Sequence, residues 1–314
     1  MVLALVGTSC TYLLRGVRWR ILLRAEREVS VITAFCGVVV GYLGNYVLPA
    51  RAGEIIRSVL IARKASLSTS YVLATAITER IMDTVTLVLI SVVALTFINN
   101  MPVWLVTSAK VMAAIACCGL AFVFLAPRFE PFLRALLRRL PLPEPVSIRF
   151  DALLSQFLLG MRALHSPVRA VSFLGLSVPI WIGDGLVTVS MAAALRLSLS
   201  VPQGLLLLAA LGLASAAPST PGYVGVFQFV AVTVLVPFGF THSHALAYII
   251  SYQAIIYVVV LVWGPIGLWK LNGWSRSTFR ISPTESVLGE NVSMSDAEGE
   301  YDLRTEAPAT RTRI

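Results

Sequence analysis

The sequence has little charge. Charged residues make up 13% of its 314 residues, about half the share usual in soluble domains, whereas hydrophobic residues make up 57% and the mean hydropathy is +0.82. This composition excludes an ordinary soluble domain. It predicts an all-α, polytopic helical membrane protein, because a helix satisfies its own backbone hydrogen bonds in lipid.

Side chains suited to metal binding or nucleophilic chemistry are scarce as well. The four cysteines, Cys10, Cys36, Cys117 and Cys118, all lie in apolar segments and form no Cys-x-x-Cys pair. The three histidines, His165, His242 and His244, lie at segment edges or in loops. A phosphate loop of the Gly-x-x-x-x-Gly-Lys type is absent, so ATP is not an evident energy source. We therefore expect no metal site and no cofactor.

Basic residues outnumber acidic ones and give a formal net charge of +9. They lie in short stretches that flank apolar segments, which is typical of cytoplasmic loops beside anionic lipid. This distribution argues against a nucleic-acid partner.

The distribution of basic residues also predicts the topology. The apolar stretches are roughly 2–14, 31–48, 68–98, 103–125, 168–194, 203–217, 224–238 and 244–269. If all of them crossed the membrane, basic loops would fall on both sides, against the positive-inside rule. All of these loops become cytoplasmic if 31–66 enters and returns from the cytoplasm and 203–238 enters and returns from outside. We therefore predict two re-entrant helical hairpins, a multi-pass protein of the cell (cytoplasmic) membrane and a cytoplasmic C-terminal tail.

The two predicted bends share a Pro-x-x-x-Gly pattern, Pro49 to Gly53 and Pro218 to Gly222, and each follows an apolar run rich in glycine and alanine. Paired Gly/Pro interruptions in opposite orientations indicate inverted repeats with a binding site near the membrane midplane. Pro221 and Gly225 add further helix breakers to the second bend.

Three charged residues, Glu79, Arg80 and Asp83, interrupt the apolar stretch from Ser70 to Ile98. In a helix Glu79 and Asp83 share a face, and Arg80 reaches Asp83 three residues on. Charge inside a bilayer is costly and usually faces a partner or a polar pathway. Two interpretations remain open, a buried ion-pair network that only joins helices and a polar cavity.

Other polar residues extend this candidate site. The first bend supplies Arg51 and the second supplies the neutral donors Ser219, Thr220 and Tyr223. Asp184 is a candidate proton site or partner of Arg51, although an Asp hydrogen-bonded to nearby backbone explains it equally well. The secondary candidates are Asn45, Arg57 and Gln228, of which Asn45 and Gln228 could instead bond a neighbouring helix.

The chain divides into a transmembrane domain, 1–272, and a disordered cytoplasmic tail, 273–314, which is polar and lacks apolar periodicity. We interpret Val2 to Leu14 as the end of a first transmembrane helix whose beginning is missing. Arg15 to Arg24 would follow it as a membrane-edge anchor of Arg and Trp at the headgroups. Residues from about 127 to 166 are expected to form an interfacial cytoplasmic segment.

Three motifs together resemble a known family. They are Gly44-Asn45-Tyr46-Val47-Leu48-Pro49-Ala50-Arg51-Ala52-Gly53-Glu54 with Arg57, Glu79-Arg80-Ile81-Met82-Asp83, and Pro218-Ser219-Thr220-Pro221-Gly222-Tyr223-Val224-Gly225-Val226-Phe227-Gln228. Over about residues 10 to 270 the chain resembles the lysylphosphatidylglycerol synthase transmembrane, or flippase-like, family.

This family includes the membrane half of multiple peptide resistance factors, which move aminoacylated phosphatidylglycerol between leaflets. It also includes free-standing members that move or handle glycolipids, polyprenyl-phosphate sugars or hopanoids. The resemblance thus implies lipid translocation or lipid handling. Only a short polar stretch follows Trp269 where relatives carry a soluble aminoacyl-transferase domain, so we do not expect this chain to synthesise lysyl-lipid.

Three functional hypotheses follow. In the first, a lipid translocase binds an anionic phospholipid or a polyprenyl-phosphate or glycolipid. Arg51 and Arg80 would bind its phosphate, and Glu54, Glu79 and Asp83 would orient them or receive a cationic headgroup. In the second, the chain presents a lipid to a membrane glycosyltransferase or lipid synthase without moving it. The third, an intramembrane enzyme, ranks lowest because no His or Cys lies near the carboxylates. An oligomer is compatible with each hypothesis.

Overall fold

The computed structural model describes residues 1–98, 103–139, 143–215 and 220–272, all of which fall in one compact unit, Met1–Ser275. The regular elements of the described chain are all helices, with no strand among them, which confirms the all-α prediction. Its elements are α1 (Val2–Leu23), α2 (Val31–Val47), η1 (Pro49–Arg51), α3 (Gly53–Ala65), α4 (Thr69–Thr96), α5 (Val103–Leu125), η2 (Ala126–Phe129), α6 (Glu130–Arg139), α7 (Glu144–Met161), η3 (Arg162–His165), α8 (Pro167–Ala194), α9 (Val201–Ala214), η4 (Pro221–Tyr223), α10 (Val226–Leu235), η5 (Val236–Phe238) and α11 (His242–Asn272).

Several described helical stretches are long and apolar enough to cross a membrane. They are Val106–Leu136, Pro167–Ala194, Pro221–Phe238 and His242–Asn272. The 22-residue α1 and the 28-residue α4 carry more charge but are of comparable length. At 1.5 Å per residue they measure about 33 and 42 Å, enough for a hydrocarbon core of about 30 Å. The chain is therefore a multi-pass membrane protein.

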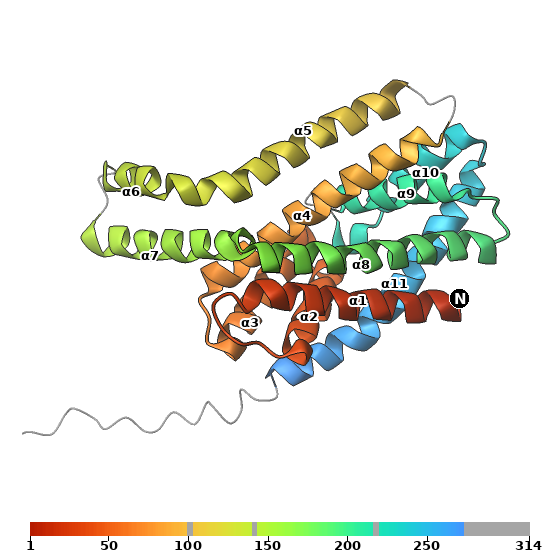
Figure 1. Cartoon of the computed structure of the whole chain (residues 1–314). Coiled ribbons are helices and arrows are strands. Elements are labelled where there is room, and N and C mark those ends of the chain that lie inside the picture. The colour runs from red at the N-terminus through yellow and green to blue at the C-terminus, as the bar shows by residue number, and fades with distance from the viewer. Residues whose placement is uncertain (99–102, 140–142, 216–219, 273–314) are drawn as a thin grey trace, which may run out of the picture. The chain divides into compact units, whose positions relative to one another are not determined.

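The helix ends gather at two ends of the bundle, and α1 runs between them (Figure 1). At one end, a buried cluster joins the last turns of α1, α3 and α11 to the start of α4 through Leu23, Ala62, Leu271 and Tyr71. At the other end, a second cluster joins the start of α1 to the last turn of α4 and to the α8–α9 connection through Ala4, Ala94 and Leu199. Most basic residues near helix ends lie at the first end, whereas Arg196 lies at the second.

The shorter helices α2 and α3 run antiparallel to each other. Successive contacts pair Gly41 with Arg57 and Gly44 with Gly53, so the two chain directions are opposed. α2 has 17 residues and α3 has 13, or about 26 and 20 Å, which is less than a full crossing. α2 starts and α3 ends near the first cluster, and the two helices meet at η1, where Ala50 and Arg51 have φ values of 56° and 57°. These two residues adopt the left-handed region that reverses the chain.

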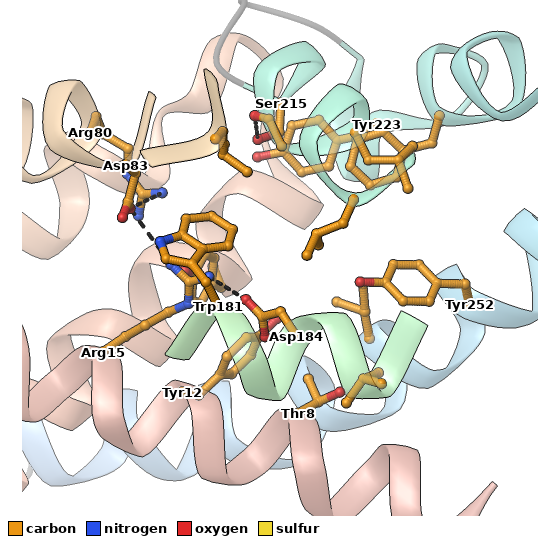
Figure 2. A pocket seen from close by; sticks show the side chains of 18 of the residues that line it. Thr8, Tyr12, Arg15, Arg80, Asp83, Trp181, Asp184, Ser215, Tyr223 and Tyr252 are labelled. Carbon is orange, nitrogen blue, oxygen red and sulfur yellow. Dashed lines mark hydrogen bonds and ion pairs between the residues drawn. The ribbon is translucent and has the colours of Figure 1, made fainter. Parts of the chain in front are cut away.

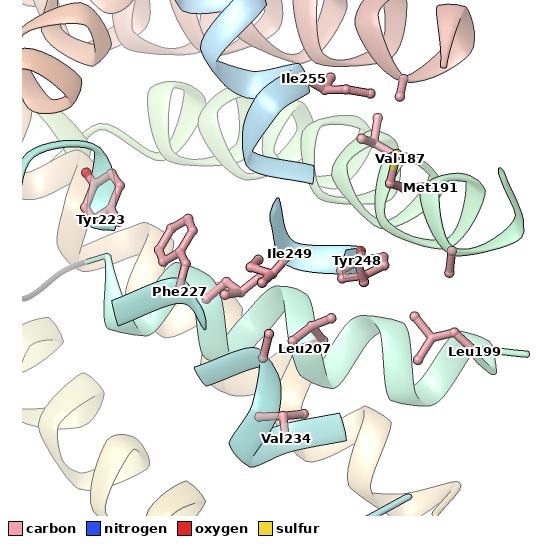
Figure 3. Packing of buried hydrophobic residues seen from close by; sticks show 14 of the residues in the cluster. Val187, Met191, Leu199, Leu207, Tyr223, Phe227, Val234, Tyr248, Ile249 and Ile255 are labelled. Atoms are coloured by element: carbon pink, nitrogen blue, oxygen red, sulfur yellow. The ribbon is translucent and has the colours of Figure 1, made fainter. Parts of the chain in front are cut away.

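The segment from α9 to α10 approaches from the opposite end. Leu199 and Leu235, at its two outer limits, both belong to the second cluster, which Figure 3 shows packed between α8, α9, α10 and α11. At its inner limit, Gly222 and Gly225 have φ values of 63° and 85°, so the regular helix α10 has only 10 residues. The predicted breakers Pro221, Gly222 and Gly225 thus lie at a real bend, whereas Pro218 lies outside the described residues.

The predicted anchor at Arg15 to Arg24 is wrong for Arg15, Arg18 and Trp19. The helix that begins at Val2 continues without a break to Leu23, and these three side chains are buried. Their face of α1 packs against α2, α4 and α8. Arg24, directly after the last residue of α1, does remain exposed and pairs with Glu28.

Residues 127 to 166 form η2, α6, α7 and η3, which lie at the far ends of α5 and α8 (Figure 1). Arg134 of α6 joins the two helices by bonding to Glu130 at 2.6 Å and to Ser155 of α7 at 2.8 Å. The location of this segment at the lipid interface stays a prediction.

Candidate functional site

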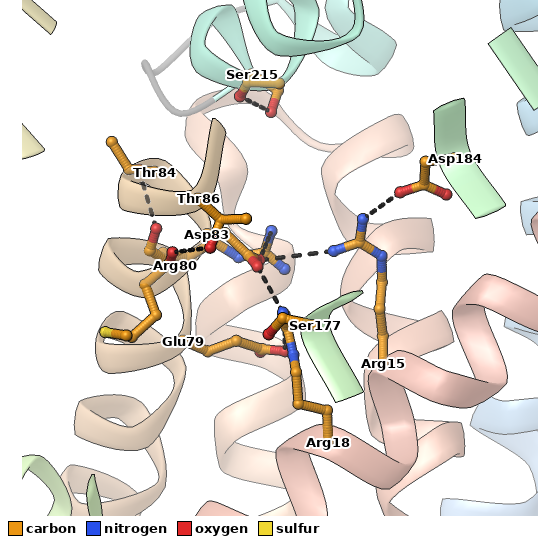
Figure 4. Close-up of polar contacts among 12 residues, drawn as sticks. Arg15, Arg18, Glu79, Arg80, Asp83, Thr84, Thr86, Ser177, Asp184 and Ser215 are labelled. Carbon is orange, nitrogen blue, oxygen red and sulfur yellow. Dashed lines mark hydrogen bonds and ion pairs between the residues drawn. The ribbon is translucent and has the colours of Figure 1, made fainter. Parts of the chain in front are cut away.

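Charged side chains from five elements meet inside the bundle, and Figure 4 shows those of α1, α4 and α8. They are Arg15 and Arg18 of α1, Arg51 of η1, Glu54 and Arg57 of α3, Glu79, Arg80 and Asp83 of α4, and Asp184 of α8. We call these nine residues the ion-pair cluster. α1, α4 and α8 are far apart in the sequence, so only the folded bundle brings their charged side chains together.

Asp83 lies at the centre of the ion-pair cluster. Its oxygens lie 2.8 Å from Arg18 Nη1, 3.5 Å from Arg15 Nη1 and 3.8 Å from Arg80 Nη1. The predicted approach of Arg80 to Asp83 is therefore confirmed. Arg15 reaches further to Asp184 of α8 at 2.5 Å, so the described partner of Asp184 is Arg15, whereas Arg51 was one of the alternatives left open.

Glu79 is more enclosed than the other two charged residues of α4, Arg80 and Asp83, with 1% of its surface exposed. It accepts from Arg18 at 3.1 Å and from Arg57 at 3.2 Å. Glu54 continues the cluster with contacts to Arg57 at 2.6 Å and Arg80 at 3.1 Å, and a longer contact to Arg51 at 3.4 Å.

Four arginines of the cluster also lie over aromatic rings. The guanidinium carbons of Arg15, Arg18, Arg57 and Arg80 lie 4.9, 4.7, 4.5 and 5.8 Å from the ring centres of Trp181, Phe173, Trp19 and Tyr42. Such cation–π contacts add to the ion pairs where water is excluded. A planar guanidinium combines both contacts, which a lysine ammonium does less well.

A cavity of about 150 Å³ opens beside the cluster (Figure 2). Arg15, Arg51, Arg80, Asp83 and Asp184 form its charged side. The rest of the lining is largely aromatic and includes Tyr12, Tyr42, Tyr46, Trp181, Tyr223, Phe227 and Tyr252, and Thr8, Thr84 and Ser215 add hydroxyl groups. A polar group and a flat or apolar group could both be bound here.

Both bends contribute to this cavity, and η1 and η4 contact each other. Tyr46, just before the first bend, meets Tyr223 of the second edge to face, with ring centres 5.7 Å apart. Tyr223 then stacks on Phe227 at 4.8 Å. Arg51 of the first bend and Tyr223 of the second, distant in sequence, therefore border one polar space.

The structure brings some predicted site residues into the cavity wall and leaves others outside it. Arg51, Arg80, Asp83, Asp184 and Tyr223 line the cavity. Glu54, Arg57 and Glu79 lie behind the lining in the ion-pair cluster. Their role in binding a ligand stays a prediction.

The remaining candidates have local structural contacts. Thr220 is exposed and donates to the Val224 carbonyl at 2.6 Å, and Ser219 lies outside the described residues. Asn45 is buried at the contact with Gly53. Gln228 accepts from the Gly225 amide at 2.7 Å and donates to Gln253, which in turn donates to the Gly222 carbonyl. Gln228 thus fixes the second bend.

Sequence reasoning missed Arg15, Arg18, Trp181 and Ser215. A signal for the two arginines was present, since positions 15 and 18 share a helix face with Thr8 and Thr11, all buried. Their partners lie 61 to 169 residues away, and no local spacing encodes such contacts. Among the described residues, no group of three His, Cys, Asp or Glu side chains is placed to hold a metal ion.

Comparison with known proteins agrees with this membrane architecture. The chain belongs to the family described as the lysylphosphatidylglycerol synthase TM region, which matches residues 1–264. The match is to the transmembrane region, and no soluble synthase domain is among the matches. The chain is also similar to the UPF0104 membrane protein MJ1078 of Methanocaldococcus jannaschii, with 25% identity over 226 residues, or 71% of this chain and 91% of that protein. No solved structure matches the chain.

Proposed function

We propose that the protein is a lipid translocase that binds an anionic or phosphate-bearing headgroup in the polar cavity while the acyl chains stay in the bilayer. One observation carries this proposal. Arginines and carboxylates line a cavity between helices long enough to span the membrane. Intramembrane ionisable groups of this kind commonly mark a substrate pathway.

The frame of this translocase is a pair of re-entrant hairpins in inverted repeats, α2–α3 and α9–α10. Support comes from their lengths, from their approach to the cavity from opposite ends, and from the contact between η1 and η4. Non-helical backbone at membrane depth is tolerated where protein buries it or where it lines a polar cavity. In this arrangement the C-terminal tail, 273–314, is cytoplasmic and follows a transmembrane domain, 1–272, of the cell membrane.

The charged side of the cavity divides into binding and supporting residues. Arg51 and Arg80 would bind the phosphate, because a guanidinium offers two parallel donors and stays charged. Glu54 and Asp83 would orient these two arginines. Glu79 and Arg57, both enclosed, would hold the frame. The chain would move or hold a lipid and would not synthesise one.

A second function is that of a lipid-presenting partner of a membrane glycosyltransferase or lipid synthase. It is favoured by apolar side chains exposed on the helices that lie between α5 and α8 in the chain, Phe129, Phe132 and Leu136 of η2–α6 and Ile148 and Leu153 of α7. Such a surface could contact another protein. Lipid binding without exchange between leaflets would favour this role over translocation.

The translocase proposal is tested by lipid exchange in liposomes. The purified protein is reconstituted with fluorescent phosphatidylglycerol, and the outer-leaflet dye is then reduced chemically. We expect nearly all dye to become accessible with the natural protein. With Arg51→Ala we expect only the outer-leaflet half, because the substitution removes a phosphate donor at a bend, where loss of the side chain should spare folding. Arg24→Ala, on an exposed pair, is the matched control. Full activity of Arg51→Ala would rule out this arginine as the phosphate-binding residue.

A further inference from the structure

The ion-pair cluster contains one more cation than anions. Its cations are Arg15, Arg18, Arg51, Arg57 and Arg80, and its anions are Glu54, Glu79, Asp83 and Asp184. Each carboxylate contacts at least one guanidinium, so we count all of them as ionised. The cluster therefore carries one net positive charge inside the membrane domain.

We propose that this excess charge sets the substrate class, and that the cavity takes a headgroup with a single net negative charge, bound by Arg51 and Trp181. The inference rests on the proposed lipid-binding function and makes it narrower. It separates a lipid whose phosphodiester is its only headgroup charge from zwitterionic and cationic lipids, which carry the same phosphodiester together with one or more cationic groups.

The excess charge can be assigned to Arg51. Arg15, Arg18, Arg57 and Arg80 each contact two carboxylates of the cluster. Among the described residues Arg51 contacts one carboxylate, Glu54 at 3.4 Å, and Glu54 is shared with two other arginines. The Nε atom of Arg51 is buried without a hydrogen-bond acceptor among the described residues. Arg51 also lines the cavity.

A second unused donor lines the same cavity from α8. Trp181 is 7% exposed, and its indole Nε1 has no acceptor among the described residues. An indole N–H can only donate, so the missing partner must be an acceptor. The other lining atoms without a regular hydrogen bond, Arg80 Nε and the Asp83 oxygens, do contact opposite charges.

A phosphodiester headgroup supplies both the negative charge that Arg51 lacks and the acceptor that Trp181 lacks. Its oxygens accept hydrogen bonds, and its single negative charge balances the single positive charge of the cluster. A zwitterionic headgroup would leave the excess charge in place, and a headgroup with a net positive charge would add to it. Because uncompensated charge inside a bilayer is costly, we expect the anionic lipid to bind most tightly.

The test is direct lipid binding, measured by native mass spectrometry of the delipidated full-length protein. The probes are dioleoyl phosphatidylglycerol, phosphatidylcholine and lysylphosphatidylglycerol, with net charges of −1, 0 and +1. We expect phosphatidylglycerol to bind about tenfold or more tightly than phosphatidylcholine, as one charge-assisted hydrogen bond would give, and the cationic lipid to bind most weakly.

Two substitutions separate charge from shape. Arg51→Gln makes the cluster neutral and should abolish the preference, whereas Arg51→Lys keeps the charge and should retain most of it. Trp181→Phe keeps an aromatic ring beside Arg15 but removes the donor. Because both lipids carry phosphodiester oxygens, it should weaken the binding of phosphatidylglycerol and of phosphatidylcholine several-fold and leave the preference between them in place. Elution as a monodisperse peak shows that each variant is folded.

The proposed charge rule is that the cavity prefers a headgroup with a net charge of −1. Equal binding of phosphatidylglycerol and phosphatidylcholine to the natural protein would overturn this rule, and so would an unchanged preference in folded Arg51→Gln. Leaflet exchange is measured separately. Selective binding without exchange would leave the charge rule standing and refute translocation. Exchange of all three lipids at equal rates, without selective binding, would support translocation and refute the charge rule.

Discussion

Arg18 is a full charge held where almost no water reaches it. Its side chain has 0% exposure, contacts Glu79 at 3.1 Å and Asp83 at 2.8 Å, and donates to Ser177 at 3.0 Å. The ring of Phe173 covers the guanidinium. A buried pair of this kind contributes little net stability compared with apolar packing, but breaking it leaves a carboxylate uncompensated.

We therefore predict that Arg18→Gln lowers the free energy of unfolding by ~3 to 5 kcal/mol, the usual cost of removing one partner of a buried pair. SDS titration of the detergent-solubilised protein measures this. Arg24→Gln, on the same helix but in an exposed pair with Glu28, should cost at most about 1 kcal/mol. Similar losses for the two variants would show that Arg18 is not in a dry environment.

At the scale of elements, glycine decides how closely α2 and α3 approach. A β-carbon at Gly53 would collide with the carbonyl oxygen of Gly41 and lie 2.6 Å from the amide nitrogen of Asn45. Backbone atoms cannot move aside as a flexible side chain can. The start of α3 and the cavity face of η1 thus depend on the absence of one methyl group.

Gly53→Ala should consequently separate α2 from α3 and destabilise the protein by more than about 2 kcal/mol, as overpacking in a rigid contact does. Gly175→Ala in α8, where nothing lies within 4 Å, is the matched control. It should be neutral or stabilising, because alanine is the better helix former. Thermal unfolding in detergent distinguishes the two, and equal melting temperatures would contradict the close contact.

The second bend offers a test of function apart from folding. Gly222 has a φ of 63°, and a β-carbon there would collide with the hydroxyl of Tyr257. We predict that Gly222→Val reduces lipid exchange more than it reduces the amount of folded protein. Gly239→Val also carries backbone strain, at a φ of 90°, but meets no neighbour within 4 Å and should retain exchange. Equal lipid exchange per folded molecule in both variants would show that the second bend is not required for lipid exchange.

For the whole molecule, the two ends of the bundle should face opposite sides of the membrane. Arg27 donates to the carbonyl of Ser66, and Leu164, two residues before Ser166, packs in the same buried cluster as Leu23. Ser66 and Ser166 therefore mark one end. The third reporter, Asn100, lies outside the described residues.

Single cysteines introduced at Ser66 and Ser166, in a chain without its native cysteines, should react only from the cytoplasm, and one at Asn100 only from outside. A membrane-impermeant maleimide applied to intact cells and to inverted vesicles makes this measurement. The reason is the excess of Arg and Lys near Ser66 and Ser166. Labelling of Ser66 and Ser166 from opposite faces would disprove the re-entrant topology.

The sequence predicted the helical segments well because apolar runs and Gly/Pro breaks are local signals. The stretches 103–125 and 168–194 correspond to α5 and α8 almost residue for residue. The cluster was predicted only in part, since Glu79, Arg80 and Asp83 are neighbours along α4 whereas Arg15 and Arg18 depend on packing between distant helices. Arg18 was interpreted as a surface anchor because a short apolar run precedes it, although its helix continues to Leu23.

The separation of Arg15 from Asp184 also has a consequence for biosynthesis. The two residues are 169 positions apart, so at ~5 to 20 residues per second the ribosome needs roughly 8 to 34 s to make the second after the first. During that interval α1 enters the translocon with its arginines still unpaired, and such a helix partitions poorly into lipid. Emergence of α4 supplies Asp83, and emergence of α8 completes the set. We therefore expect α1 to settle in the bilayer only after α4 and α8, which follow it in the chain, have emerged.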